Sequence, residues 1–169
     1  MKVKVLASGS KGNVTYVEDG NTRLLIDIGM RCIYVEEKLR EMDVEPKTID
    51  AILITHTHTD HIMGLFWIFK AMMGIMKNRK YEGQLNIYCN REVARNIEVM
   101  MPCLLPIKGI ELLKQYMIIH ILDDGMHKNI IDLDFEFFDV LDDDFELILF
   151  LFYKLFFKIC SCTIFNCLM

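Results

Sequence analysis

The order of apolar and polar positions along the chain predicts short strands that alternate with helices. Short apolar runs between turn-forming residues are typical of strands, and apolar residues three and four apart are typical of helices. These patterns predict strands over residues 3–7, 14–17, 23–27, 51–55 and 84–89. They predict helices over residues 32–42, 62–76, 91–101 and 104–115, with Pro102 ending the third. An alternation of this kind indicates the α/β class.

From residue 117 onward the pattern is that of β structure alone. Residues 117–122 and 130–140 flank the turn Asp123-Asp124-Gly125, and the second segment alternates apolar with polar positions. We therefore predict a hairpin between these two segments. The turn Asp19-Gly20-Asn21 predicts an earlier hairpin in the same way.

The last 25 residues differ from the rest, because they hold six of the eleven phenylalanines. The uninterrupted apolar run 147–153 is seven residues long, whereas a spanning helix needs about 20. We therefore do not expect membrane anchoring, and favour a helix or strand that packs on the domain. A frame change or truncation would also explain the change in composition. We divide the chain into a domain over residues 1–144 and an apolar tail over 145–169.

Composition narrows the class of protein. The chain has 169 residues, 53% of them hydrophobic, which suits one globular domain with a core. Its formal net charge of −5 excludes a general attraction for polyanions, so any contact with nucleic acid has to be local. Six cysteines are too few for a disulfide scaffold, and the first residues do not form a secretory signal. We expect a cytoplasmic protein with reduced thiols.

Three of the five histidines lie within six residues, between a predicted buried strand and a predicted helix. The cluster contains His56, His58, Asp60 and His61, and imidazole and carboxylate groups are ligands that suit zinc. Residues two apart in extended chain face the same side, so His56 and His58 could bind one metal while Asp60 and His61 face a second. The alternative is a structural loop in which Thr59 or Asp60 caps the helix.

The spacing His-x-His-x-Asp-His after a strand resembles the signature of the metallo-β-lactamase superfamily. Asp27-Ile28-Gly29 resembles the strand-borne Asp-x-Gly of that superfamily, and Ser8 to Asn13 resembles the opening loop of its exonuclease-like members. The resemblance covers about residues 2 to 140. It implies a four-layer αββα sandwich, of which this chain holds the N-terminal half and part of the second sheet.

By this resemblance the chain is a zinc-dependent hydrolase, with one or two Zn²⁺ or another divalent metal as cofactor. Ribonuclease Z-like and exonuclease-like members imply phosphodiester bonds as the target, in nucleic acid or a small molecule. The same resemblance makes Asp60 the catalytic residue, which accepts a proton from the attacking water or orients it. Lys70, Lys77, Arg79 and Lys80 could steer a phosphate backbone, or could simply be solvated.

The chain also departs from the family pattern. Members have a later histidine, a bridging aspartate and a final histidine, whereas no histidine follows His127 here and Leu141 stands where one is expected. His120 and His127 are interpreted as ordinary histidines, and Asp142 to Asp144 could supply a carboxylate. The missing ligands would come from that acidic run or from a partner chain, and uncovered apolar surface would favour self-association. The alternative is a truncated, weak or inactive remnant that acts at most as a metal-binding or interaction module.

Overall fold

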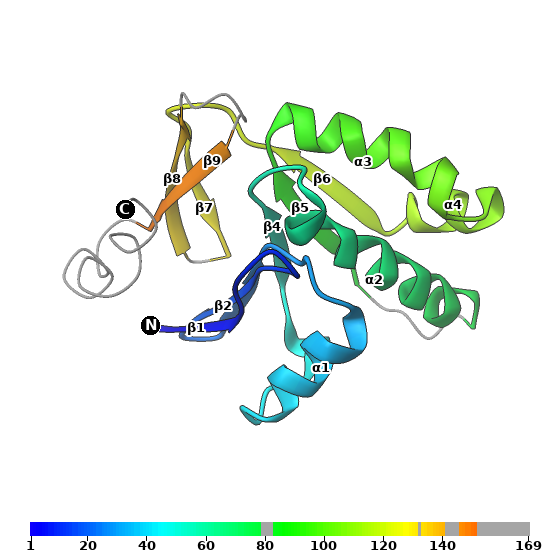
Figure 1. The fold of residues 1–169 in the computed structure, drawn as a ribbon, viewed down its shortest axis with the longest axis horizontal. Helices are drawn as coiled ribbons and strands as arrows, with labels where there is room; N and C mark the ends of the chain where they lie inside the picture. The colour runs from blue at the N-terminus through cyan, green and yellow to red at the C-terminus, as the bar shows by residue number, and fades with distance from the viewer. Residues whose placement is uncertain (79–82, 132, 141–145, 152–169) are drawn as a thin grey trace.

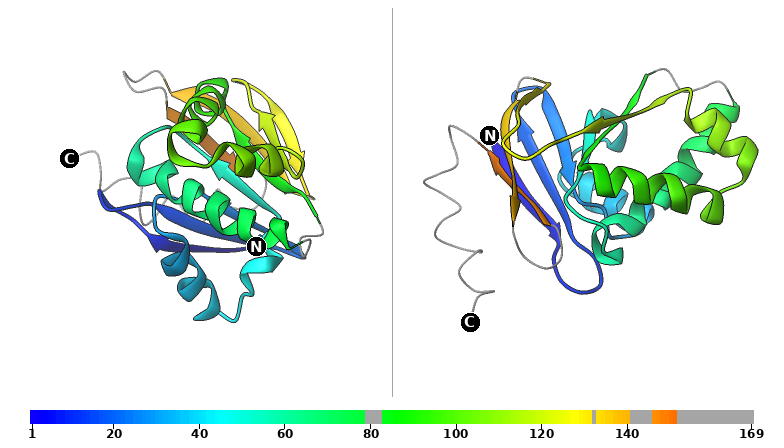
Figure 2. Two further views of the ribbon diagram at one scale, coloured as in Figure 1. Left: turned by 90° about the vertical axis from the view of Figure 1, so that its right-hand side faces the viewer. Right: turned by 90° about the horizontal axis from the view of Figure 1, so that it is seen from above.

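The protein is built in three layers: helices, a large sheet and a small sheet (Figures 1 and 2). The computed structural model describes residues 1–78, 83–131, 133–140 and 146–151. Within these ranges no helix covers the outer face of the small sheet. The described part therefore agrees with the predicted α/β class and with an incomplete sandwich.

The large sheet has six strands in chain order. They are β1 (Lys2–Ala7), β2 (Val14–Asp19), β3 (Thr22–Ile26), β4 (Ala51–Ile54), β5 (Leu85–Cys89) and β6 (Met117–Ile121). The pairs β1·β2 and β2·β3 are antiparallel, which confirms the hairpin at Gly20, and β3 to β6 run parallel. The carboxyl ends of β3, β4, β5 and β6 consequently lie along one edge of the sheet.

Four α-helices and one 3₁₀ turn lie on one face of this sheet (Figure 2). They are α1 (Cys32–Arg40), η1 (Pro46–Thr48), α2 (Thr59–Lys77), α3 (Arg91–Leu104) and α4 (Ile107–Leu113). None of these helices is both long and apolar enough to cross a membrane. The expectation that Pro102 ends α3 is wrong, because Pro102 lies in the last turn of the helix. A proline there removes one helical hydrogen bond close to the end, where the helix continues for only two residues.

The alternation of side chains along the strands divides the core in two. Along β4, Ile52 and Ile54 face the helices, whereas Ala51 and Leu53 face the small sheet. The small sheet consists of β7 (His127–Ile130), β8 (Leu133–Val140) and β9 (Glu146–Leu151). Its Phe135 contributes to the second core cluster. A central strand that is apolar on both faces is the expected result of burial between two layers.

The predicted hairpin between residues 117–122 and 130–140 is wrong. β6 instead pairs in parallel with β5, and the hairpin forms between β7 and β8. β6 has Ile119 in the helix-side core and Ile118 on the other face, a pattern that suits the large sheet better than a hairpin with one exposed face. Of the predicted tail, residues 146–151 form β9 beside β8, and residues 152–169 lie outside the described part. The boundary at residue 144 stays a prediction.

Candidate metal centre

Three loops meet where β1, β3 and β4 end, and backbone hydrogen bonds join them. Asn13 N donates to Asp60 O at 2.6 Å, and Ile28 N donates to His61 O at 2.7 Å. Gly29 N donates to Asn13 O at 3.0 Å. Segments far apart in the sequence thus hold the start of α2 in place.

Two glycines allow these loops to pack this closely. A Cβ atom at Gly29 would lie 1.6 Å from the carbonyl oxygen of Asp60, and one at Gly64 would lie 2.1 Å from that of Met30. Neither distance leaves room for a side chain. The glycine of the Asp-x-Gly sequence is therefore required by the contact between the loop after β3 and the first turn of α2.

The structure brings the histidines of the predicted cluster together. The ring centroids of His56 and His61 are 3.7 Å apart, and those of His56 and His58 are 4.9 Å apart. His56 is 5% exposed, His58 is exposed, and the side chain of Asp60 is 27% exposed. The cluster therefore extends from the core to the surface, as a site that must receive a substrate requires.

Asp27 lies beside the cluster, where it contacts His61 directly and His56 through Thr55. Its buried carboxylate accepts hydrogen bonds from Thr55 N at 2.8 Å and from Thr55 Oγ1 at 2.9 Å, and it lies 2.8 Å from His61 Nδ1. Thr55 Oγ1 also lies 2.9 Å from His56 Nδ1. Because an ionised carboxylate only accepts, His61 donates from Nδ1, and the Thr55 hydroxyl donates to Asp27 and accepts from His56 Nδ1. Both imidazoles then carry their lone pair on Nε2, which is the form that binds metals.

The backbone at Asp27 is part of this arrangement. Its φ of 57° lies in the left-handed region, which aspartate tolerates better than most residues. Asp27 N donates to Leu53 O at 2.8 Å, so the turn remains attached to the neighbouring strand. The turn directs the carboxylate toward the loop after β4 rather than along the sheet.

Asn13 contacts the two cluster members nearest the helix. Its Nδ2 donates to Asp60 Oδ2 at 2.9 Å and lies 2.9 Å from His61 Nε2, while Asp60 Oδ2 and His61 Nε2 are 3.4 Å apart. Asn13 Oδ1 accepts from Gly9 N at 3.0 Å, which fixes the side chain within its own loop. This amide therefore orients the Asp60 carboxylate and the outer nitrogen of His61.

Neither Thr59 nor Asp60 caps α2, so the alternative of a structural capping loop is wrong for these two residues. α2 begins at Thr59, its N-cap residue is His58, and no side chain makes the capping hydrogen bond. Asp60 lies in the first turn, where a carboxylate favours the helix dipole. The polar residues of the motif are thus directed to one another rather than to the end of the helix.

The side chains of the cluster are of the types that bind divalent metals, but they are not arranged around a common point. Among the described residues, no three His, Cys, Asp or Glu side chains are arranged to hold a metal ion. His61 Nε2 faces Asn13 and Asp60, and the imidazole rings pack against each other. Two imidazoles with Nε2 lone pairs beside an aspartate are nevertheless the ligand types that zinc takes.

The remaining candidates from the sequence lie elsewhere or outside the described residues. His120 Nε2 lies 3.0 Å from Asn86 Oδ1 and its ring stacks on Tyr88, while His127 pairs with Glu136 at 3.2 Å. Residues 142–144, and Arg79 and Lys80, fall outside the described ranges. Lys70 and Lys77 lie exposed on α2.

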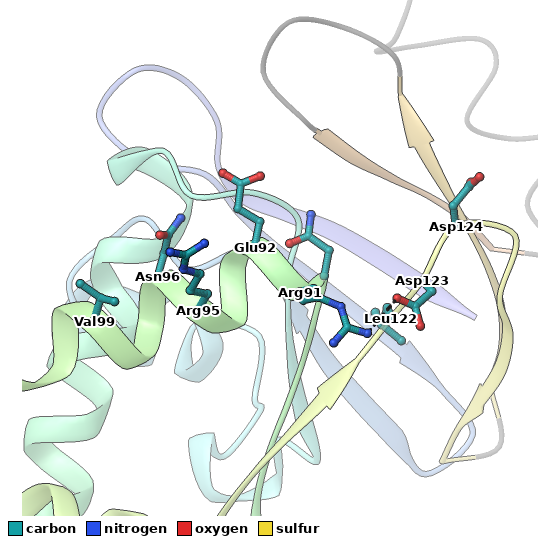
Figure 3. Close-up of a pocket in the computed structure, with 9 residues that line it drawn as sticks. Arg91, Glu92, Arg95, Asn96, Val99, Leu122, Asp123 and Asp124 are labelled. Carbon is teal, nitrogen blue, oxygen red and sulfur yellow. Dashed lines mark ion pairs between the residues drawn. The ribbon is translucent and has the colours of Figure 1, made fainter.

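A pocket of about 750 Å³ lies further along the same sheet edge, where β5 and β6 end (Figure 3). Its charged residues are of both signs: Arg91, Glu92, Arg95, Asp123 and Asp124. The ion pair between Arg91 and Asp123 is long, with Nη2 3.7 Å from Oδ1, and both side chains are well exposed. None of the histidine cluster lines this pocket, so we place the candidate chemistry at the cluster.

Comparison with known proteins relates part of the chain to a known family. A sequence model described as the metallo-beta-lactamase superfamily matches residues 7–71, the segment that contains all three loops. Residues 7–71 are thus similar to the metallo-β-lactamase superfamily. Exodeoxyribonuclease WalJ of Streptococcus pneumoniae is 37% identical over 97 residues, 57% of this chain and 32% of the relative. Ribonuclease Z of Archaeoglobus fulgidus is 36% identical over 84 residues, 47% of this chain and 24% of the relative.

The fold is similar to that of solved metallo-β-lactamase proteins. The metallo-beta-lactamase fold protein YhfI from Bacillus subtilis aligns with a TM-score of 0.66 at 18% identity, over 87% of this chain and 56% of that chain. The predicted sandwich fold is thereby confirmed. The aligned segments span about a third of the length of WalJ and about a quarter of ribonuclease Z.

Three residues of this centre were not among the predicted site residues. In the sequence, Asp27 stands out only as part of the Asp-x-Gly resemblance, Asn13 only as the end of a loop, and Thr55 only as the end of a strand. Each ends up beside the histidine cluster because its loop follows a strand at the same sheet edge. The order of the strands could have indicated Asp27, since the loops that follow neighbouring parallel strands meet at one edge.

Proposed function

We propose that this chain is a zinc-dependent hydrolase of phosphodiester bonds, with His56, His58, Asp60 and His61 as its metal ligands. The observation that carries the proposal is that His61 Nδ1 lies 2.8 Å from Asp27 Oδ2 and His56 Nδ1 lies 2.9 Å from Thr55 Oγ1. These contacts assign the ring proton of each neutral imidazole to Nδ1 and the lone pair to Nε2. A purely structural loop has no need to set the same tautomer in two neighbouring imidazoles. The relatives named as an exodeoxyribonuclease and a ribonuclease Z support a phosphodiester in nucleic acid as the substrate.

Each ligand has a place in the proposal. His56 and His58 would hold one zinc, and Asp60 and His61 would hold a second. Zinc, when bound, supplies Lewis-acid stabilisation of negative charge on a phosphoryl oxygen. The donation from Asn13 Nδ2 keeps the Asp60 carboxylate oriented so that its oxygens can accept a proton from an attacking water. His58 and Asp60 lie at the exposed end of the cluster, where a substrate would approach.

Two further proposals concern the chain as a whole. Residues 1–144 would form the catalytic domain, with the remaining ligands supplied by the acidic residues 142–144 or by a partner chain. The sparse cysteines are consistent with reduced thiols, and therefore with a cytoplasmic enzyme.

The first test is elemental analysis of the purified chain, together with hydrolysis of bis(p-nitrophenyl) phosphate and of a labelled DNA strand. We expect bound zinc and turnover of both substrates in the wild-type chain, with both lost in His58→Ala. His127→Ala is the control, because this exposed histidine pairs with Glu136 on the small sheet. It should keep both properties.

A different result would overturn the proposal. A wild-type chain with less than half a zinc per molecule and no turnover of either substrate would mean that the cluster is an inherited remnant. The chain would then act at most as an interaction module. Equal zinc content in His58→Ala and His127→Ala would show that the bound metal lies outside the cluster.

A further inference from the structure

The one tryptophan of the chain lies on the outer face of α2. Trp67 is 50% exposed, while Phe66 and Phe69 on the other face of the helix are buried in the core. The Nζ atom of Lys70 lies 5.6 Å from the centroid of the Trp67 ring. A large aromatic side chain left half in water, with a cation beside it, is available for contact with another molecule.

Trp67 lies on the same side of α2 as Asp60 of the candidate metal centre. α2 begins next to His58, and Asp60 and Trp67 are seven residues apart, close to two helical turns. They therefore lie on the same side of the helix, separated by about 10 Å along its axis. A chain that occupies the centre at Asp60 and continues along this side of α2 would reach Trp67.

The charge of α2 differs from that of the helices beside it. The only acidic residue in Thr59–Lys77 is Asp60, at the centre itself, while Lys70 and Lys77 are exposed. α1 and α3 each carry two glutamates and two basic residues, so their charged side chains balance, whereas α2 has two lysines and one aspartate. In a chain with a net charge of −5, the outer face of α2 is where a phosphate backbone meets little repulsion.

We propose that Trp67 and Lys70 form a binding surface for single-stranded nucleic acid, on which a base stacks on the indole and a phosphate pairs with the ammonium group. The inference rests on the proposed function, since it supplies a path for the substrate beyond the cluster. A single strand is required, because paired and stacked bases in a duplex do not offer their faces to a side chain. Stacking on one aromatic ring tolerates any base, as a nuclease without sequence preference needs.

The test measures binding separately from hydrolysis. Fluorescein-labelled oligo(dT) and oligo(U) of about twelve nucleotides are titrated with the full chain in EDTA, and the anisotropy gives the Kd. The variants are Trp67→Ala, Trp67→Phe and Lys70→Gln. Ile33→Ala is the matched control, because Ile33 is 71% exposed on α1 and belongs to no part of the proposed surface. Circular dichroism of each variant verifies the fold.

We expect Trp67→Ala to weaken binding about fivefold or more, the loss of one stacked base, and Trp67→Phe to restore most of it. Lys70→Gln should reduce the slope of log K against log salt concentration by about 0.7, the loss of one phosphate contact. Ile33→Ala should bind as the wild type does. If the Kd for oligo(dT) differs from that for oligo(U), the lower value identifies the preferred sugar. A preference for either oligonucleotide supports the proposal.

Equal binding by Trp67→Ala and Ile33→Ala would overturn the proposal, as would a wild-type chain that binds neither oligonucleotide. A change in sedimentation of Trp67→Ala without any change in binding would assign Trp67 to a protein contact instead. The proposed function is judged separately, by hydrolysis of bis(p-nitrophenyl) phosphate in the wild-type chain with zinc. Binding without hydrolysis would support the surface and overturn the proposed activity. Hydrolysis without binding would support the activity and overturn the surface.

Discussion

One edge of the large sheet holds two regions of very different construction. Where β3 and β4 end, the loops are joined by short hydrogen bonds, and the buried Asp27 carboxylate contacts Thr55 and His61. Where β5 and β6 end, one backbone hydrogen bond links them, from Leu122 N to Cys89 O at 2.9 Å. The side chains there contribute an N-cap hydrogen bond at Asn90 and a long, exposed ion pair beside a pocket (Figure 3).

The difference shows that topology alone does not make a site. Parallel strands bring loops to a common edge at both places, yet only the first region has buried polar groups that depend on one another. A buried carboxylate needs its partners, whereas an exposed ion pair contributes little. We therefore expect substitutions in the first region to affect stability far more than substitutions in the second.

The largest effect should come from Gly29→Ala. The new Cβ would lie 1.6 Å from Asp60 O and 2.9 Å from Asn13 N, both backbone atoms, so the loop after β3 must move away from α2. We expect the free energy of unfolding to fall by about 3 kcal/mol or more, as measured by urea denaturation. Gly74→Ala is the control, because a Cβ there meets nothing within 4 Å on the exposed side of α2. It should gain about 0.5–1 kcal/mol from helix propensity, and a similar loss in both variants would contradict the argument.

The next effect should come from Asp27→Asn. The amide would present its NH₂ group to donors on Thr55 or His61, so a charge-assisted hydrogen bond would be lost and the imidazole tautomers released. We expect a loss of about 2 kcal/mol in stability and a weakening of zinc affinity by about 10- to 100-fold, measured by calorimetric titration.

Asp50→Asn provides the comparison for Asp27→Asn. Asp50 Oδ2 accepts from Arg23 N at 2.8 Å, outside the cluster, and an asparagine oxygen can still accept this hydrogen bond. Zinc affinity should be unchanged in this variant. If both variants bind zinc as tightly as the wild type, Asp27 does not orient the ligands.

The sequence predicts the positions of the helices and strands better than it predicts which strands pair. Local periodicity located the strands of the large sheet and the four α-helices to within a few residues, because burial on both faces produces apolar runs that a sequence displays. The partner of β6 could not be predicted in this way. Apolar residues on both faces of a strand indicate burial, but they do not say which neighbour it pairs with, so a local hairpin was wrongly preferred to the distant β5.

In the first region, four residues within one six-residue segment predict the histidine cluster. Asn13 and Asp27 could not be added from the sequence, because they contact His61 across 48 and 34 positions respectively. Their contribution depends on loop geometry that the left-handed backbone of Asp27 and the absence of a side chain at Gly29 create. Long-range contacts of this kind leave only short, unspecific patterns in a sequence.

A smaller effect is expected in the second region from Asn90→Ala. The Asn90 side chain accepts a hydrogen bond from Val93 N at 2.8 Å and caps α3. Its loss should reduce the free energy of unfolding by about 1 kcal/mol in urea denaturation and leave zinc affinity unchanged. Asn96→Ala, inside the same helix, should instead be neutral or gain about 0.5 kcal/mol. A loss of zinc affinity in Asn90→Ala would mean that the two regions are coupled.

The smallest effect concerns pH and His120, which lies next to the end of β6. Burial, and secondarily the positive charge of Lys128, lower the pKa of His120 below its ordinary value. Its neutral ring stacks on Tyr88 with centroids 4.3 Å apart, and its Nε2 lies 3.0 Å from Asn86 Oδ1. The folded state therefore holds the neutral form more strongly than the unfolded chain does.

The sign of the pH effect follows from this difference. As the pH falls below about 6.5, the unfolded chain takes up a proton at His120 more readily than the folded protein, so this residue lowers the stability in acid. We expect His120→Gln to flatten the decrease in melting temperature between pH 7.5 and pH 5, relative to the wild type. His127→Gln, at an exposed position on β7, should leave the contribution of His120 in place. A steeper decrease in His120→Gln would show that the ring is protonated in the folded state and that its contact with Asn86 outweighs burial and Lys128.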